Sequence, residues 1–231
     1  MDFTTITQYD LWLLPLLSGP HTMFFDAFAQ ILTAGVTWIL LYIILFFIVI
    51  KNNETMGQIG LVVLSVTVCI LFADGMADGI AKPLCMRLRP LNDPDVRPML
   101  NLVAGMADKN YSFFSAHAAN TFSVCVFFML LVRHLWFAVA MAGWSLLNCW
   151  TRLYLCMHYP SDILVGLLWG AFVGIAVYLV YRRLYNRISP KLHFISSQYT
   201  RSGYALSDVY LVMNVILFTI LYAVIRALTL M

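Results

Sequence analysis

The chain has 231 residues, of which 62% are apolar and 11% charged, whereas a soluble domain is typically about 45–50% apolar and about 25% charged. This surplus of apolar residues is too large for the core of a soluble domain of this length, so the composition predicts a polytopic membrane protein. The formal net charge of +3 is too small to indicate a nucleic-acid partner.

The apolar runs predict an all-α protein with six transmembrane helices, because a span needs roughly 20 predominantly apolar residues. A shorter apolar run at 11–17 comes first and is predicted to form an interfacial helix on the membrane surface. The predicted spans are 25–50, 58–81, 114–132, 135–152, 161–181 and 208–228. With such short loops, we interpret 1–231 as a single integral-membrane domain.

The basic residues predict the orientation of the spans. The odd-numbered loops carry Lys51, Arg133, Arg182, Arg183, Arg187, Lys191 and Arg201. The opposite side, with both termini, carries Lys82, Arg87, Arg89, Arg97, Lys109, Arg152 and Arg226. The count is seven against seven, but it becomes seven against four if Lys82, Arg89 and Arg152 are reserved for chemistry. The odd-numbered loops are then predicted to be cytoplasmic.

Small and sulfur-containing residues within the spans have simpler interpretations. Gly166, Gly170 and Gly174 recur every four residues, which favours close helix packing within the monomer over a dimer seam. The five cysteines show no zinc-type spacing, and their odd number argues against a disulfide framework.

Polar residues gather in three segments beside the predicted span ends, at 82–90, 112–117 and 151–162. The end of the second span, the start of the third, the end of the fourth and the start of the fifth share one side of the membrane. The three segments are therefore expected to converge at one membrane face, where polar groups are costly and typically functional.

The residue types in these segments suit a phosphate group. Lys82, Arg89 and Arg152 are cationic donors, and the arginines offer a planar fork. Backbone N–H groups near Ser115 and Ala116, at a helix start, are expected to add anion contacts. Taken singly, Lys82, Arg87 and Arg89 have an ordinary role as cations flanking a membrane interface, and Ser115 has one as a helix cap.

Two histidines in the same segments can divide the work of nucleophile and proton donor, namely His117 and His158. Asp162 follows His158 by four residues, and Pro160 favours a helix start between them. A carboxylate in that first turn can bond one ring nitrogen of His158 and leave the other free to attack. Alone, His117 is more typical of a structural histidine and Asp162 of a helix-dipole partner, so the joint placement carries the argument.

Two acidic residues precede Lys82 at intervals of four. Asp74, Asp78 and Lys82 are expected on one helical face. We favour an ion pair in which Asp78 holds Lys82 in place; the alternative gives Asp74 a role in a polar headgroup pocket.

The spacing of these residues resembles the type 2 phosphatidic acid phosphatase (PAP2) superfamily over about residues 10–185. The family motifs K-x6-R-P, P-S-G-H and S-R-x5-H-x3-D match Lys82-x6-Arg89-Pro90, Ser115-x-His117 and Arg152-x5-His158-x3-Asp162. There are three departures, namely Phe114 for Pro, Ala116 for Gly and Thr151 for Ser. We expect them to affect substrate preference more than catalysis, because Thr151 keeps a hydroxyl and Ala116 its N–H.

The resemblance implies specific roles. His158 would be the nucleophile that forms a phosphohistidine, Asp162 would orient it, and His117 would be the general acid. The implied phosphate-binding residues are Lys82, Arg89, Ser115, Ala116, Thr151 and Arg152. The resemblance implies no metal and no other cofactor, because fixed cations supply the charge stabilisation.

The expected function is that of a bacterial inner-membrane lipid phosphatase, with its site facing the periplasm and its phosphorylated lipid substrate arriving from the bilayer. Lipid A and undecaprenyl diphosphate are the favoured substrates, and phosphatidylglycerol phosphate or phosphatidate is the alternative. Two other classes are less favoured. A vanadate-dependent haloperoxidase is one, but its relatives are soluble. A non-enzymatic lipid-binding or transport protein is the other, but such a protein would be expected to have lost some of the motif residues that are present here. The oligomeric state is left open.

Overall fold

The computed structural model describes residues 3–100, 102–103, 111–188 and 197–231, with side chains from residue 8 onward. Within these ranges the protein is all-α, as predicted, and the only β-contact is an isolated bridge between Tyr199 and Ala205. The elements are α1 (Phe3–Ser18), α2 (Met23–Thr33), η1 (Gly35–Trp38), α3 (Ile39–Lys51), α4 (Met56–Asp74), the π-helix η2 (Gly75–Ala81), α5 (Lys82–Cys85), η3 (Arg97–Met99), α6 (Ala116–Val132), α7 (Leu135–Tyr154), α8 (Pro160–Ile188) and α9 (Leu206–Leu228).

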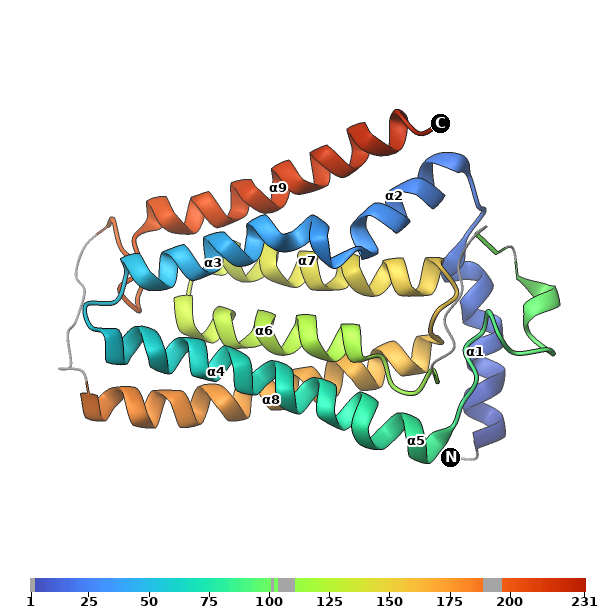
Figure 1. Ribbon diagram of the computed structural model, residues 1–231, viewed down its shortest axis with the longest axis horizontal. Helices are drawn as coiled ribbons and strands as arrows, with labels where there is room; N and C mark the ends of the chain where they lie inside the picture. Colours follow the sequence, from blue (N-terminus) through green and yellow to red (C-terminus); the bar gives the residue numbers. More distant parts are fainter. Residues whose placement is uncertain (1–2, 101, 104–110, 189–196) are drawn as a thin grey trace.

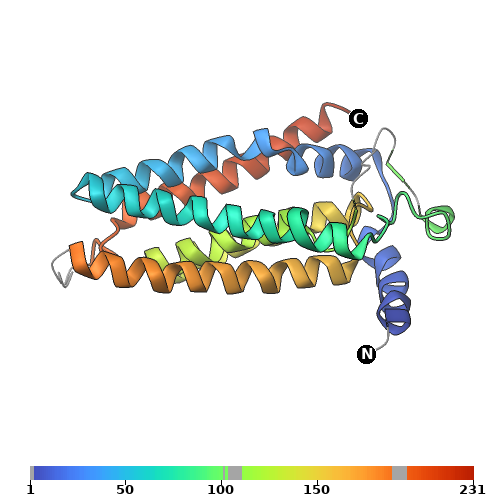
Figure 2. The ribbon, with the colours of Figure 1, turned by 60° about the horizontal axis from the view of Figure 1, so that its bottom comes forward.

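The helices form an elongated bundle, and α1 lies across one of its ends (Figures 1 and 2). This end, which we call the α1 end, also holds α5, the C-terminus of α7 and the N-terminus of α8. The helix α6 lies in the interior, packed against α4, α7 and α8. The arrangement confirms that the three polar segments share one end of the bundle.

All six predicted spans are helical, but they do not all have the length and hydropathy of a membrane span. Three helical stretches do, namely Met56–Cys85, Pro160–Ile188 and Leu206–Leu228, and a fourth is added if α2 and η1–α3 count as one span bent by 67°. The helix α6 is apolar but has only 17 residues. The prediction of six spans is therefore supported for three or four of them.

The helix α7 falls short because polar residues occupy its second half. Asn148, Thr151 and Arg152 lower its hydropathy, yet all three side chains are buried inside the bundle. A helix whose polar face is covered by neighbouring helices need not be apolar all round. The hydropathy of α7 thus reflects its interior position.

Side chains donate hydrogen bonds to backbone carbonyls at the bend between α2 and α3. The Thr37 hydroxyl donates to the Ile31 carbonyl at 2.5 Å, and the Trp38 indole donates to the Leu32 carbonyl at 2.8 Å. Unsatisfied carbonyls are costly at membrane depth, so these two bonds explain why the break is tolerated.

The glycine stripe of α8 packs against α6 within the monomer, as favoured from the sequence. A Cβ on Gly166 would lie 2.7 Å from the Ser115 carbonyl oxygen, and one on Gly170 would lie 2.6 Å from that of Ala119. The absence of side chains therefore lets the two backbones touch. This contact seats the start of α6, which carries Ser115 and His117, against the start of α8.

Among the described basic residues, Arg182, Arg183 and Arg187 are exposed at the C-terminal end of α8, at the end of the bundle opposite α1. Lys109 and Lys191, which entered the charge comparison, lie outside the described residues.

Candidate active site

The α1 end brings together the residues of all three motifs. Lys82 begins α5, Arg152 lies in the last turn of α7, and His158 lies in the short connection from α7 to α8. Lys82, Arg89, Arg152 and His158 lie close enough to His117 for their charges to act on its imidazole, so the residues predicted as acid, nucleophile and phosphate-binding cations are near one another.

His158 is buried, and its Nδ1 atom faces Asp162. The distance from Nδ1 to the Asp162 Oδ2 atom is 3.7 Å, which is longer than a hydrogen bond. The Ser112 hydroxyl lies 3.5 Å from Nδ1 and donates a short hydrogen bond to Oδ2. Ser112 thus links the carboxylate to the imidazole, a role that the sequence did not assign to it.

Asp162 is fully buried and is held by groups from three segments. Arg87 donates to Oδ1 at 2.9 Å, while the Tyr159 backbone N–H at 2.9 Å and the Ser112 hydroxyl both donate to Oδ2. These partners keep the carboxylate in one orientation toward His158. The backbone also binds the two motifs together, because the Ser115 N–H donates to the Asp162 carbonyl at 3.2 Å.

Arg87 was counted in the sequence as an ordinary flanking cation, and the structure places it in the site instead. It lies two residues before Arg89, and nothing in the local spacing separates the two roles. If Arg87 is also reserved for chemistry, the remaining basic residues number seven on the odd-numbered loops and three on the α1 side. The charge bias behind the predicted orientation therefore becomes stronger.

The surroundings of His158 keep its imidazole neutral. Burial lowers the pKa of His158 to about 4, and the positive charges of Arg89 and Lys82 add to this effect while Asp162 opposes it. The tautomer that carries its proton on Nδ1, facing Ser112 and Asp162, leaves the Nε2 lone pair available to a substrate. A neutral, oriented imidazole is the form that a nucleophilic histidine needs.

The three predicted phosphate-binding cations are buried. Lys82 Nζ forms an ion pair with Asp78 at 2.5 Å, which confirms the favoured interpretation of that spacing. Arg89 donates to the Met157 carbonyl at 3.3 Å, and Arg152 Nη1 lies 3.0 Å from the Met157 sulfur. Both arginines thus contact the residue directly before the predicted nucleophile.

Two predicted phosphate-binding hydroxyls have partners within the protein. The Thr151 hydroxyl donates to the Asn148 carbonyl at 2.7 Å and lies 3.2 Å from the Thr33 hydroxyl. Ser115 caps α6, its Oγ accepting from the Ala118 N–H at 3.4 Å, and Ala116 is the first residue of that helix. Their contacts to phosphate remain predictions, and a phosphate bound by either hydroxyl would replace a present partner.

His117 has an exposed side chain near the N-terminus of α6. One turn further along α6, Asn120 donates to Asp74 at 2.9 Å, which ties α6 to α4. The π-helix η2 follows Asp74, so that Asp74 pairs with α6 while Asp78 pairs with Lys82. Such π-turns interrupt regular helical spacing and are frequent at functional sites.

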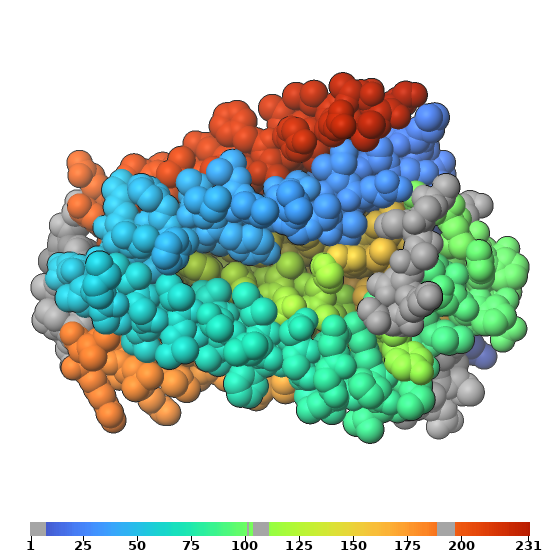
Figure 3. Space-filling model, in the orientation of Figure 1, coloured from blue at the N-terminus to red at the C-terminus, as the bar shows by residue number. Residues whose placement is uncertain are grey.

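A recess opens on the side of the bundle between α4 and the bent α2–α3 segment. Figure 3 shows α6 and the C-terminal half of α7 at its floor. The two helices at the floor are those that carry His117 and Arg152. The recess is therefore bordered by two of the helices that carry predicted site residues.

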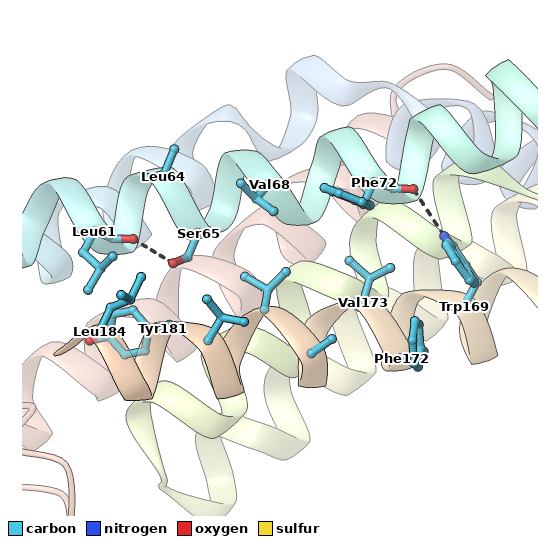
Figure 4. Close-up of a pocket in the computed structure, with 13 residues that line it drawn as sticks. Leu61, Leu64, Ser65, Val68, Phe72, Trp169, Phe172, Val173, Tyr181 and Leu184 are labelled. Atoms are coloured by element: carbon cyan, nitrogen blue, oxygen red, sulfur yellow. Dashed lines mark hydrogen bonds between the residues drawn. The ribbon is translucent and has the colours of Figure 1, made fainter. Parts of the chain in front are cut away.

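A second hollow lies between α4 and α8 and has a volume of about 410 Å³. Figure 4 shows it extending from Leu61 and Leu184 to Phe72 and Trp169, whose indole donates to the Phe72 carbonyl at 3.3 Å. Its lining is almost wholly apolar and includes none of the predicted site residues. It is an apolar groove between two helices, separate from the polar residues at the α1 end.

A buried histidine and buried cations at one end of a helical membrane bundle are the arrangement that the sequence motifs predicted, and the comparison with known families agrees with the class of enzyme. The PAP2 superfamily profile matches residues 58–186, more than half of the chain. The chain therefore belongs to the PAP2 superfamily and is a phosphatase.

Two relatives are similar to this chain over most of its length. A lipid A 4'-phosphatase of Bacteroides thetaiotaomicron is 33% identical over 79% of this chain and 81% of its own length. A lipid A 4'-phosphatase of Porphyromonas gingivalis is 30% identical over 81% of this chain and 77% of its own length. No solved structure matches the chain significantly.

Proposed function

We propose that the protein hydrolyses a phosphate monoester of lipid A, and so removes one phosphate group, by way of a phosphohistidine intermediate. The observation that carries this proposal is the His158–Ser112–Asp162 arrangement, with three buried cations beside it and His117 facing the same space. The substrate is suggested by the two relatives, both named lipid A 4'-phosphatase.

In the first step, His158 Nε2 attacks phosphorus and the bond to the sugar oxygen breaks. Lys82, Arg89 and Arg152 stabilise the negative charge on the equatorial oxygens. A sugar alkoxide is a poor leaving group, so His117 donates a proton to the departing oxygen. The lipid alcohol leaves, and the phosphoryl group stays on His158.

In the second step, water attacks the phosphohistidine. His117, now neutral, accepts a proton from this water, and the P–N bond breaks to release inorganic phosphate. Ser112 and Asp162 keep the Nδ1 proton in place throughout. At the end of this step His117 is protonated again and His158 is free and neutral again.

The chemistry is proposed to need no metal ion, because fixed cationic side chains surround the phosphoryl position. We also propose the bacterial inner membrane as the location, with six helices traversing it and the α1 end in the periplasm. The apolar helices, the relatives and the basic residues at the opposite end of α8 support this orientation.

Phosphate release from purified substrates tests the proposal. The protein in detergent is given lipid A, undecaprenyl diphosphate, phosphatidylglycerol phosphate and phosphatidate, each in excess EDTA. We expect the fastest release from lipid A, with vanadate as an inhibitor. Activity that EDTA abolishes and Mg²⁺ restores would contradict the metal-independent mechanism, and preference for another lipid would contradict the substrate.

A further inference from the structure

The interfacial helix α1 places a buried carboxylate beside the candidate site. Asp10 is only 2% exposed, and it shares the inward face of α1 with Leu14, which is 1% exposed. The apolar side chains of Tyr9, Trp12 and Leu16 are exposed on the other faces of the helix, as expected for a helix in the membrane interface. One side of α1 therefore presents apolar side chains outward, while the other packs Asp10 and Leu14 into the protein.

Both oxygens of Asp10 bind groups that also surround the nucleophile. Oδ1 accepts the backbone N–H of Ser161 at 2.9 Å. Oδ2 accepts the Ser161 hydroxyl at 2.6 Å and forms an ion pair with Arg87 Nη2, also at 2.6 Å. Asp10 thus binds the first turn of α8, next to Asp162, from outside that helix.

Arg87 joins this carboxylate to the one that faces His158. Its Nη2 binds Asp10, and its Nη1 binds Asp162 at 2.9 Å. The guanidinium lies over the Tyr159 ring, with its central carbon 3.8 Å from the ring centroid. Two buried carboxylates therefore share one guanidinium whose plane is fixed by stacking.

A buried ion pair is weak evidence for a role in stability, because desolvation offsets most of the attraction. What stands out is the continuity of the contacts, from Asp10 through Arg87 to Asp162 and then through Ser112 to His158. Without the Asp10 charge, Arg87 Nη2 loses its anionic partner, and the guanidinium is held less firmly, by the Tyr159 ring and its Nη1 contacts, in the plane that serves Asp162.

We infer that Asp10 is a positioning residue for the His158 nucleophile, acting through Arg87 and Asp162. This inference rests on the proposed phosphatase mechanism. It makes the interfacial helix α1 part of the catalytic apparatus, so that seating of α1 on the bundle sets the orientation of the nucleophile.

The test compares Asp10→Asn with Asp95→Asn, an exposed aspartate at the same end of the bundle that serves as the matched control. We expect Asp10→Asn to lower the single-turnover rate of phosphoenzyme formation by about 10- to 100-fold, which is the size of effect that loss of a buried hydrogen bond to a charged group typically has. Inhibition by inorganic phosphate should be unchanged, because Lys82, Arg89 and Arg152 are intact. Asp95→Asn should match the wild type in both measurements.

A double-mutant cycle separates positioning from general destabilisation. If Asp10 acts through Asp162, the Asp10→Asn change should lower the rate of phosphoenzyme formation by less than about threefold in an Asp162→Asn background. The reason is that the effects of mutating residues in one connected series of contacts are not additive. If Asp10→Asn does not fold, Arg87→Lys takes its place, since it keeps the charge but loses the fork. The same loss of rate is expected from that variant.

Three outcomes would overturn the inference alone: a wild-type rate in Asp10→Asn, an undiminished loss in the Asp162→Asn background, or weaker phosphate inhibition in proportion to the rate. They are distinguishable from failure of the proposed function, in which the wild-type protein itself would form no phosphoenzyme with any substrate and both proposals would fall.

Discussion

The Ser112 hydroxyl donates a hydrogen bond to the carboxylate of Asp162, the residue predicted to orient the nucleophile. The same hydroxyl lies 3.5 Å from His158 Nδ1, closer than the carboxylate itself. His158, the proposed nucleophile, thus belongs to a three-residue arrangement rather than to a direct pair with Asp162.

Ser112→Ala is expected to lower the rate of phosphoenzyme formation by about 10- to 100-fold, because a lost buried hydrogen bond costs about 1–3 kcal/mol and leaves the imidazole less well oriented. Single-turnover labelling measures this rate. Ser65→Ala is the control, since the Ser65 hydroxyl is buried but bonds only the Leu61 carbonyl of its own helix. Equal rates in the two variants would show that Ser112 does not act on His158.

The two histidines should respond differently to the leaving group. His158→Ala should abolish phosphoenzyme formation with every substrate, whereas His117→Ala should be partly rescued by p-nitrophenyl phosphate, whose leaving group needs no proton. General-acid assistance is typically worth ~10²–10⁴ in rate, so the rescue is measurable. Acid-labile ³²P labelling and single-turnover rates distinguish the variants. Labelling that persists in His158→Ala would reverse the assigned roles.

The lowered pKa of His158 predicts the acid side of the pH profile. A base whose pKa falls from 6.5 to about 4 keeps its nucleophilic neutral form as the pH drops through 6 and 5. With p-nitrophenyl phosphate and His117→Ala, which removes the other histidine, the rate of phosphoenzyme formation should stay nearly constant from pH 7 to about pH 5. A half-maximal rate near pH 6.5 would contradict this prediction.

The contact between α6 and α8 predicts a strong effect of a single methyl group. In Gly166→Ala the new Cβ would meet the Ser115 carbonyl at 2.7 Å, and backbone cannot move aside as a side chain can. We expect a loss of about 1–3 kcal/mol in stability, as in other overpacked cores, together with reduced activity. Thermal unfolding in detergent measures the first effect. Gly143→Ala, which has no neighbour within 4 Å, should cost little, and equal losses in both variants would argue against this packing.

The predicted orientation is testable by cysteine labelling. Cys85 is exposed and the other four cysteines are buried, so the experiment starts from Cys85→Ser. Asn92→Cys, at the α1 end, should react with an impermeant thiol reagent in intact spheroplasts, whereas Asn186→Cys should react only after lysis. Both positions are exposed. The opposite pattern would place the candidate site in the cytoplasm.

The outline of the fold and most of the site could be predicted from the sequence. The apolar composition indicated a helical membrane protein, and parity alone brought Lys82, Arg152 and His158 to one end, because successive spans must alternate in direction. The interval of four between Asp78 and Lys82 also identified an ion pair, since it depends on local helical geometry.

Only the tertiary structure decided which residues surround Asp162 and His158, the proposed nucleophile. Asp10, Arg87 and Ser112 are separated from Asp162 by 50 residues or more, and no local periodicity relates side chains across such intervals. Arg87 and Arg89 look alike as cations after the second span, but one binds two buried carboxylates while the other contacts the backbone of Met157. The roles differ because each depends on which helix ends the folded bundle brings within hydrogen-bond distance, and that is set by packing.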